Sequence, residues 1–278
     1  MIRRTWNLIN PRAVVWRYMK KRHPNKAIIA KLRGGIKVRI YPHDIIGEPI
    51  YVNGMFEPSE CKFVMKFLTP GMVFFDVGAN LGQYTLLAAQ RVGREGQVHS
   101  FEPSSRMFAE SKYNVELNDL SNICTLNKLA LSNKVGTAKL SRYQPGAEVY
   151  GSLGTQCRES PIVGYEVVET TTLDTYVEKK GVDHIDLIKM DIEGAELLAL
   201  QGSEHTLSKS IAPAIVLEMA DINTIGLEYQ ATEIWDYLEQ FGYQFYCFNK
   251  RGQISGLAQR PVDFSRYQDL VALKRPNV

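Results

Sequence analysis

The chain has 278 residues, which is enough for one large α/β domain or for a domain with an extension. Its 45% hydrophobic and 23% charged residues are typical of a globular protein, and no apolar run has the length of a transmembrane helix. The four cysteines (Cys61, Cys124, Cys157 and Cys247) form no C-x-x-C pair, which argues against a zinc site or a disulfide framework and favours a reduced, cytoplasmic setting.

The N-terminal arm is strongly basic. Residues 1–39 hold 12 of the 33 Lys and Arg residues and no Asp or Glu, so the rest of the chain has 21 basic against 30 acidic residues. Such an arm suits an anionic surface: a membrane, a phosphate-bearing lipid-linked substrate or nucleic acid. We favour peripheral contact of residues 1–39 with an anionic membrane over nucleic acid. We therefore divide the chain into a basic extension, 1–44, and a main domain, 45–278.

The first predicted elements lead to a glycine turn. Pro11 marks a helix start in a weakly amphipathic stretch, residues 36–40 alternate as a strand does, and residues 58–67 predict a helix. The apolar run 73–77 then predicts a buried parallel strand, followed by the turn Gly78-Ala79-Asn80-Leu81-Gly82 and a helix from Gln83 to Arg91. A strand, a glycine turn and a helix N-terminus together are typical of a nucleotide-binding site.

The middle of the chain continues the pattern and then interrupts it. Residues 97–101 and 123–126 predict strands on either side of a helix that ends near Leu117. Between the strands expected at 137–141 and 166–170 lies a long glycine-rich and polar stretch. Long loops inside compact domains are usually functional, so we expect this one to cover a substrate pocket.

In the last part of the chain, predicted strands again alternate with predicted helices. Strands are predicted at 185–191, 214–217, 243–248 and 270–273, and helices at 172–180, 193–200 and 232–241. Strands that alternate with helices predict an α/β fold with a doubly wound, mostly parallel sheet.

Acidic residues end four of these strands: Asp76, Glu102, Asp191 and Glu218. Ligands of such sheets bind at the carboxyl ends of the strands. Glu102 lies 20 residues after Gly82, a spacing that suits an acid binding both ribose hydroxyls of either NAD or S-adenosylmethionine. The turn is not G-x-G-x-x-G, and Asp76 repels a pyrophosphate but attracts ammonium and sulfonium charges. These features favour S-adenosylmethionine.

Four stretches together resemble the FkbM family of S-adenosylmethionine-dependent methyltransferases: Phe74–Gly82, Phe101-Glu102-Pro103, Thr171-Thr172-Leu173-Asp174, and Ile185–Glu196 with its Lys-x-Asp-x-Glu-Gly-x-Glu run. The likeness spans about residues 45–250. It implies a class I methyltransferase fold, Rossmann-like, with a seven-stranded sheet and one antiparallel strand. It also implies O-methylation of a sugar, glycolipid, polysaccharide or polyketide-type acceptor.

The resemblance also implies the cofactor site. On the family's pattern Asp76, Gly78, Asn80 and Gly82 line the methionine end of S-adenosylmethionine, and Glu102 binds the ribose. The full set of residues expected at the cofactor is Asp76, Gly78, Ala79, Asn80, Gly82, Tyr84, Glu102, Pro103 and Ser104.

Transfer of a methyl group to a hydroxyl needs in-line positioning and a base for the hydroxyl proton. Asp191 ends the fourth strand beside the donor, and Glu193 is expected to open the next helix and face the same cleft. Lys189 shares a strand face with Asp191, so it either orients Asp191 or acts as the base if desolvated. These three are the candidate catalytic residues. Glu196, one helical turn later, is expected to be solvated.

Three alternatives remain open. Asp191, Glu193, Glu218 and Asp221 offer oxygen ligands for a divalent metal, which we do not favour because scattered acids are common. An NAD-dependent oxidoreductase has a similar sheet. A non-enzymatic module is the third alternative, in which the basic arm binds a membrane or nucleic acid surface.

Overall fold

The structure is a computed structural model that describes residues 10–154 and 161–274. Its helices are α1 (Pro11–Arg22), α2 (Gly47–Asn53), α3 (Pro58–Phe67), α4 (Gln83–Val92), α5 (Ser105–Glu116), α6 (Leu173–Lys180), α7 (Glu196–Gln201), α8 (Glu204–Ser208), α9 (Asp221–Thr224) and α10 (Ala231–Glu239), with 3₁₀ turns η1 (Glu148–Tyr150) and η2 (Ile225–Leu227). Its strands are β1 (Ile28–Lys31), β2 (Lys37–Ile40), β3 (Val73–Val77), β4 (Gln97–Phe101), β5 (Cys124–Asn127), β6 (Ala130–Leu131), β7 (Gly136–Tyr143), β8 (Ile162–Thr171), β9 (Leu187–Met190), β10 (Ala214–Met219), β11 (Tyr243–Phe248), β12 (Ile254–Leu257) and β13 (Gln268–Lys274).

The main sheet confirms the predicted α/β class. It has eight strands in the order β12-β11-β13-β10-β9-β3-β4-β5. The five strands from β10 to β5 are parallel, and β13 runs antiparallel to both of its neighbours. The edge strand β12 is antiparallel to β11 and comes in addition to the seven strands implied by the resemblance.

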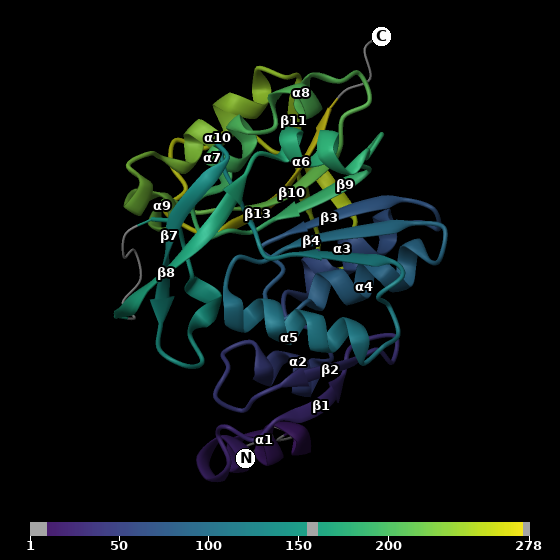
Figure 1. Ribbon diagram of the computed structural model, residues 1–278, viewed down its shortest axis with the longest axis vertical. Coiled ribbons are helices and arrows are strands. Elements are labelled where there is room, and N and C mark those ends of the chain that lie inside the picture. The colour runs from purple at the N-terminus through teal and green to yellow at the C-terminus, as the bar shows by residue number, and fades with distance from the viewer. Residues whose placement is uncertain (1–9, 155–160, 275–278) are drawn as a thin grey trace, which may run out of the picture.

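Helices cover both faces of this sheet because its central strands are apolar on both sides. All five residues of β3 are buried, as expected for a central parallel strand. Phe74 packs into one hydrophobic cluster with α3, α4 and the N-terminal elements, whereas Phe75 and Val77 pack into a second cluster with α6, α7 and α10. Figure 1 shows the two layers on opposite sides of the sheet.

The basic N-terminal elements pack against the main domain (Figure 1). Trp16 of α1 is fully buried, and its ring lies 5.3 Å from that of Tyr51 in α2. Arg39 of β2 forms a 2.7 Å ion pair with Glu110 of α5. One hydrophobic cluster therefore spans the predicted boundary between residues 44 and 45. Within the described residues, no helix is long and apolar enough to cross a bilayer.

A small second sheet, β6-β8-β7, stands beside the carboxyl ends of the main strands. Its strands β7 and β8 are longer than the sequence indicates and pair antiparallel along most of their length. Their connection includes the stretch predicted to cover a pocket. Val149, Tyr150 and Leu153 from this connection line the main cavity, whereas residues 155–160, with Cys157, lie outside the described residues.

Besides the 3₁₀ turns, six elements were not predicted, β1, α2, β6, α8, α9 and β12, and one helix start was wrong. The sequence gives no strong pattern for β1, for α2 with its internal Pro49, or for β12, whose four residues are all exposed. Helix α7 begins at Glu196 rather than Glu193, because Glu193 has a φ of 50° and Gly194 one of 100°, which form a turn instead.

Candidate active site

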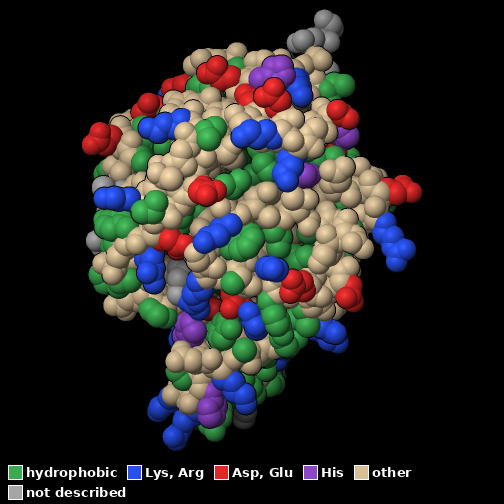
Figure 2. Space-filling view, viewed as in Figure 1, with side chains coloured by type: hydrophobic (Ala, Val, Ile, Leu, Met, Phe, Trp, Pro, Cys, Tyr) green, Lys and Arg blue, Asp and Glu red, His purple; other side chains and the backbone are tan. Residues whose placement is uncertain are grey.

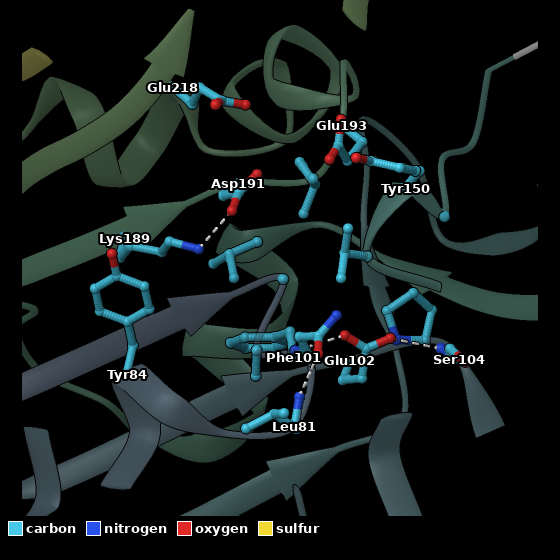
Figure 3. A pocket seen from close by; sticks show the side chains of 18 of the residues that line it. Leu81, Tyr84, Phe101, Glu102, Ser104, Tyr150, Lys189, Asp191, Glu193 and Glu218 are labelled. Carbon is cyan, nitrogen blue, oxygen red and sulfur yellow. Dashed lines mark hydrogen bonds and ion pairs between the residues drawn. The ribbon is translucent and has the colours of Figure 1, made fainter. Parts of the chain in front are cut away.

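A cavity of about 290 Å³ opens at the carboxyl ends of β3, β4 and β9, where the sequence places a ligand (Figure 3). The predicted residues that line it are Gly78, Ala79, Asn80, Tyr84, Glu102, Pro103, Ser104, Lys189, Asp191 and Glu193. The fold therefore brings together ten of the residues that sequence reasoning selected.

The glycine turn forms the floor of this cavity. The backbone N–H groups of Gly78 and Ala79 both donate to the carbonyl oxygen of Phe101, at 3.0 Å. Gly78 has a φ of +85°, and a Cβ there would lie 1.9 Å from the carbonyl oxygen of Asp191. Only glycine fits this close approach of β3 to the chain that follows β9.

Glu102 reaches the cavity from the end of β4. Its Oε2 accepts a 2.8 Å hydrogen bond from the backbone N–H of Asn80, and its Oε1 accepts one of 2.9 Å from Ser104. Burial raises the pKa of Glu102 to about 7. Each carboxylate oxygen keeps a lone pair for a further donor, so the side chain can accept the two hydroxyls of a ribose.

Asp76 and Gly82 are absent from the described cavity wall, contrary to the expectation of direct cofactor contact. Asp76 is fully buried beneath the turn, where its Oδ2 accepts a 2.6 Å hydrogen bond from Thr85. Burial raises the pKa of Asp76. Gly82 is the N-cap of α4 and lies against Ser111, so both residues shape the turn from behind.

Lys189 and Asp191 form the central ion pair of the cavity. Lys189 Nζ donates to Asp191 Oδ2 at 2.9 Å and lies 4.6 Å from the centroid of the Tyr84 ring (Figure 3). Burial opposes the positive charge, but the carboxylates of Asp191, Glu57 and Asp76 outweigh it and raise the pKa of Lys189. Lys189 therefore stays protonated and orients Asp191, and it cannot serve as a base at neutral pH.

Glu193 and Glu196 occupy different places from those expected. Glu193 lines the cavity from a turn instead of a helix, and its backbone oxygen accepts a 2.6 Å hydrogen bond from Ser152. Glu196 was expected to be solvated, but it is 2% exposed and accepts a 2.9 Å hydrogen bond from the N–H of Ile192. Burial raises the pKa of Glu196 to about 7. Glu196 thus holds the turn that carries Glu193.

Glu218 joins the cavity at the end of β10, but Asp221 does not. Burial, followed by the charges of Asp191 and Glu193, raises the pKa of Glu218 to about 9. Asp221 instead accepts backbone hydrogen bonds from Ala231 and Phe264. Across residues 10–154 and 161–274, no three His, Cys, Asp or Glu side chains are arranged to hold a metal ion.

Sequence reasoning missed the wall formed by residues that precede the glycine turn. Ile45, Ile46, Ile50, Phe56 and Glu57 all line the cavity. Their positions depend on how α2 and α3 pack, which no local pattern reveals. The one local feature of the sequence that could have pointed to this wall is Glu57, an acidic residue directly before Pro58 at the start of α3.

Comparison of the sequence with models of protein families shows to which family the chain belongs. Residues 76–245, more than half of the chain, match the model of the methyltransferase FkbM domain. The chain belongs to the FkbM methyltransferase family. The matched region begins at Asp76, so it leaves out the wall formed by residues 45–57.

One relative carries the name of this family. The 31-O-demethyl-FK506 methyltransferase FkbM of Streptomyces tacrolimicus is 26% identical over 228 residues, which are 73% of this chain and 82% of the relative. Similar solved structures include an O-methyltransferase from Bacillus cereus in complex with S-adenosylhomocysteine (12% identity, 78% of this chain and 80% of that chain, TM-score 0.45). A putative rRNA methylase from Clostridium thermocellum shows 14% identity over 77% of this chain and 92% of that chain, with a TM-score of 0.45.

The protein is thus a methyltransferase that uses S-adenosylmethionine. The cavity suits this cofactor because Glu102 can accept the ribose hydroxyls and because carboxylates surround the space beyond the glycine turn, where a sulfonium and an ammonium would lie. Family membership does not favour the NAD-dependent oxidoreductase or the non-enzymatic surface module.

Proposed function

We propose that this methyltransferase transfers the methyl group to a hydroxyl of a sugar, glycolipid, polysaccharide or polyketide-type acceptor. The observation that carries the proposal is the carboxylate of Asp191, fixed by Lys189 at 2.9 Å in a cavity that also contains Glu193 and Glu218. An alcohol needs such a base, because it is a weak nucleophile until its proton is removed. The name of the Streptomyces relative, which refers to an O-demethyl substrate, supports the same chemistry.

Two groups of residues would hold the donor. In this proposal Glu102 accepts the ribose hydroxyls, with Pro103 and Ser104 beside it, and the backbone of Gly78, Ala79 and Asn80 faces the methionyl part. When bound, S-adenosylmethionine supplies an electrophilic methyl group on its sulfonium. Asp76 and Gly82 act indirectly, because they set the shape of the turn from behind the cavity wall.

Asp191 is the proposed base. It accepts the hydroxyl proton as the new carbon–oxygen bond forms and the carbon–sulfur bond breaks. Lys189 holds the carboxylate in one orientation and remains charged throughout. Glu218 stays protonated at neutral pH because its pKa is raised to about 9, so it can donate a hydrogen bond to the acceptor. Glu193 lies in the same cavity and is the second candidate for proton removal.

Product analysis tests this function. The protein is incubated with trideuteromethyl-labelled S-adenosylmethionine and panels of glycans, lipid-linked sugars and polyketides, and products are detected by mass spectrometry. We expect a single labelled methyl group on an oxygen, located by fragmentation. A labelled methyl group found only on nitrogen or carbon would contradict the proposal while leaving the cofactor assignment intact.

For the partner, we infer that the outer face of α1 contacts an anionic membrane. Val14, Val15 and Tyr18 on this face are 49%, 45% and 61% exposed, and Arg17 and Arg22 are exposed with them. Figure 2 shows blue Lys and Arg side chains around the protruding lower end of the molecule, where Figure 1 places α1. Exposed apolar side chains within a basic surface match the chemistry of a lipid interface. Binding to anionic vesicles is the measurement that tests this contact.

A further inference from the structure

Backbone strain marks Glu57 as part of the active site. Five residues other than glycine have a positive φ in the described chain, and three of them line the cavity: Glu57 (49°), Asn80 (50°) and Glu193 (50°). Strained residues persist where the surrounding structure holds them, often at functional sites. Asn80 and Glu193 belong to the stretches already singled out, whereas Glu57 precedes the region matched by the family model.

The first turn of α4 holds Glu57 in place. The side chain of Gln83 accepts a 2.7 Å hydrogen bond from the N–H of Phe56 and donates one of 3.1 Å to its carbonyl oxygen. The next residue, Tyr84, donates a 2.8 Å hydrogen bond from its hydroxyl to Glu57 Oε2. The helix that follows the glycine turn thus holds the Glu57 carboxylate next to Tyr84 in the cavity lining.

The charges around Glu57 are unbalanced. Lys189 is the one Lys, Arg or His among the described residues that line the cavity, and its ammonium is bonded to Asp191. The acidic residues that line the same cavity are Glu57, Glu102, Asp191, Glu193 and Glu218. A small side pocket adds Glu60 and Asp269 next to Glu57. This end of the cavity therefore favours a ligand that brings positive charge.

We propose that Glu57 binds the α-ammonium group of the methionyl part of S-adenosylmethionine. The inference rests on the use of this cofactor and extends the donor site to a residue outside the matched family domain. An α-ammonium has three N–H donors, and the Glu57 Oε1 and Oε2 together offer more acceptor positions than Tyr84 uses. Tyr84 also lies under Lys189, so the same aromatic ring links the proposed ammonium site to the catalytic ion pair.

The raised pKa of Glu57 is consistent with a carboxyl group whose neighbours are mostly acidic. Burial first, and then the charge of Asp191, raises the pKa of Glu57 to about 7, although Lys189 and Tyr84 oppose the shift. The other groups that face it are the acids Glu60 on α3, Glu218 on β10 and Asp269 on β13, and the thiol of Cys61 on α3. A bound ammonium would lower this pKa, so binding near pH 7 should release a proton.

A thermodynamic cycle tests the proposal. Isothermal titration calorimetry compares S-adenosylhomocysteine with its desamino analogue, in which hydrogen replaces the ammonium, on the wild type and on Glu57→Gln. We expect the wild type to bind the desamino analogue at least tenfold more weakly, a difference of about 1.4 kcal/mol. Glu57→Gln should bind both ligands with the same weakened affinity. Glu48→Gln is the matched control, since Glu48 of α2 lines neither the main cavity nor the side pocket, and it should leave both affinities unchanged.

The opposite results are equally clear. Unchanged affinity for S-adenosylhomocysteine in Glu57→Gln, or an undiminished preference for the ammonium in that variant, overturns the proposal while cofactor use stands. Should Glu57→Gln fail to fold, the wild type decides by titration in two buffers of different ionisation enthalpy at pH 7. Proton release must then be larger with S-adenosylhomocysteine than with the desamino analogue, and equal release refutes the assignment.

Discussion

At the scale of single residues, Lys189 determines how the neighbouring carboxyls behave. It is buried among Asp76, Glu57 and Asp191, and its ammonium donates to Asp191. Because this lysine stays protonated, the bases that we propose are the carboxylates of Asp191 and Glu193. In this proposal the ion pair fixes the orientation of the Asp191 carboxylate. Its Oδ2 accepts the hydrogen bond from Lys189, and its Oδ1 accepts the hydroxyl proton.

Replacing Asp191 by Asn separates chemistry from binding. The amide keeps a hydrogen-bond acceptor for Lys189 but is no longer a base, so turnover should fall by about 10²–10⁴-fold, the usual contribution of a general base. Affinity for S-adenosylhomocysteine should change little. The measurements are single-turnover rates and calorimetric dissociation constants, with Glu193→Gln as the comparison. If Glu193→Gln loses turnover and Asp191→Asn keeps it, Glu193 is the base.

Gly78 allows a second residue-scale prediction. Gly78→Ala places a Cβ 1.9 Å from the carbonyl oxygen of Asp191, in a segment held by the 3.0 Å hydrogen bond from Asp191 N–H to Val77. We expect a large loss in the free energy of unfolding and of affinity for S-adenosylhomocysteine, measured by urea denaturation and calorimetry. Gly71→Ala is the matched control, because Gly71 has a similar φ of +88° with nothing within 4 Å.

The control isolates the steric contact. Gly71→Ala should lose only the cost of a left-handed backbone, about 1–2 kcal/mol, and keep its cofactor affinity. Equal losses in the two variants would show that the backbone conformation matters and that the approach of β3 to Asp191 does not.

At the scale of elements, α1 is a helix with one buried and one exposed side. Its inner face is fixed by Trp16, so changes on the outer face should leave the fold intact. We expect Val14→Ser/Tyr18→Ser to sediment less with vesicles that contain phosphatidylglycerol than the wild type does. Binding of the wild type should also weaken as salt rises, because the basic side chains attract the anionic lipid.

Val262→Ser tests whether any exposed apolar side chain promotes vesicle binding. Val262 is 93% exposed and lies in the segment between β12 and β13. Val262→Ser should bind vesicles as the wild type does. If the α1 double variant and Val262→Ser bind equally well, the outer face of α1 is not the membrane contact.

The sequence predicted those elements whose pattern reflects burial. β3 and β9 are apolar except for Asp76 and Lys189, and α4 follows a recognisable turn, so the core of the cofactor site was accessible to sequence reasoning. β12 is exposed along its whole length and has no such pattern. Glu196 looked like a surface acid because its helical spacing does not reveal that it folds back onto the N–H of Ile192.

At the scale of the whole molecule, buried acids dominate the expected pH dependence. Several buried carboxyls have raised pKa values, among them Glu57, Glu102 and Glu196 (to about 7), Asp269 (to about 8) and Glu218 (to about 9). A carboxyl whose pKa is higher in the folded than in the unfolded protein contributes stability at low pH, and this contribution is lost as pH rises through the folded value. These acids thus destabilise the ligand-free protein progressively as pH rises from their unfolded pKa values near 4 to their folded values of about 7 to 9.

We therefore expect the Tm of the ligand-free protein to be lower at pH 9 than at pH 6. S-adenosylhomocysteine should reduce this difference, because an ammonium near the acids favours their ionised forms. Thermal denaturation at both pH values, with and without the ligand, measures the effect. A Tm that rises steadily from pH 6 to pH 9 without ligand would contradict it.

The wall formed by residues 45–57 depends on the whole molecule and was beyond local prediction. Ile45, Ile50 and Glu57 reach the cavity only because α2 and α3 pack on the layer that contains α4. Nothing in the local sequence around these three residues indicates that they contact a cavity built by strands much later in the chain. Similarly, Asp76 seemed to point at the ligand because it ends a strand, yet the alternation of β3 directs it to Thr85 on the covered side of the sheet.

The position of β13 has a consequence for the order in which the protein can be made. This strand lies between β10 and β11, although the ribosome completes it after both. Until residues 268–274 emerge, the edge of β10 is unpaired and the β11–β12 hairpin has no neighbour to join it to the sheet. Open strand edges invite association with other chains. The nascent protein is therefore exposed to association with other chains between the emergence of β11 and that of β13, after β3, β4 and β9 have already emerged.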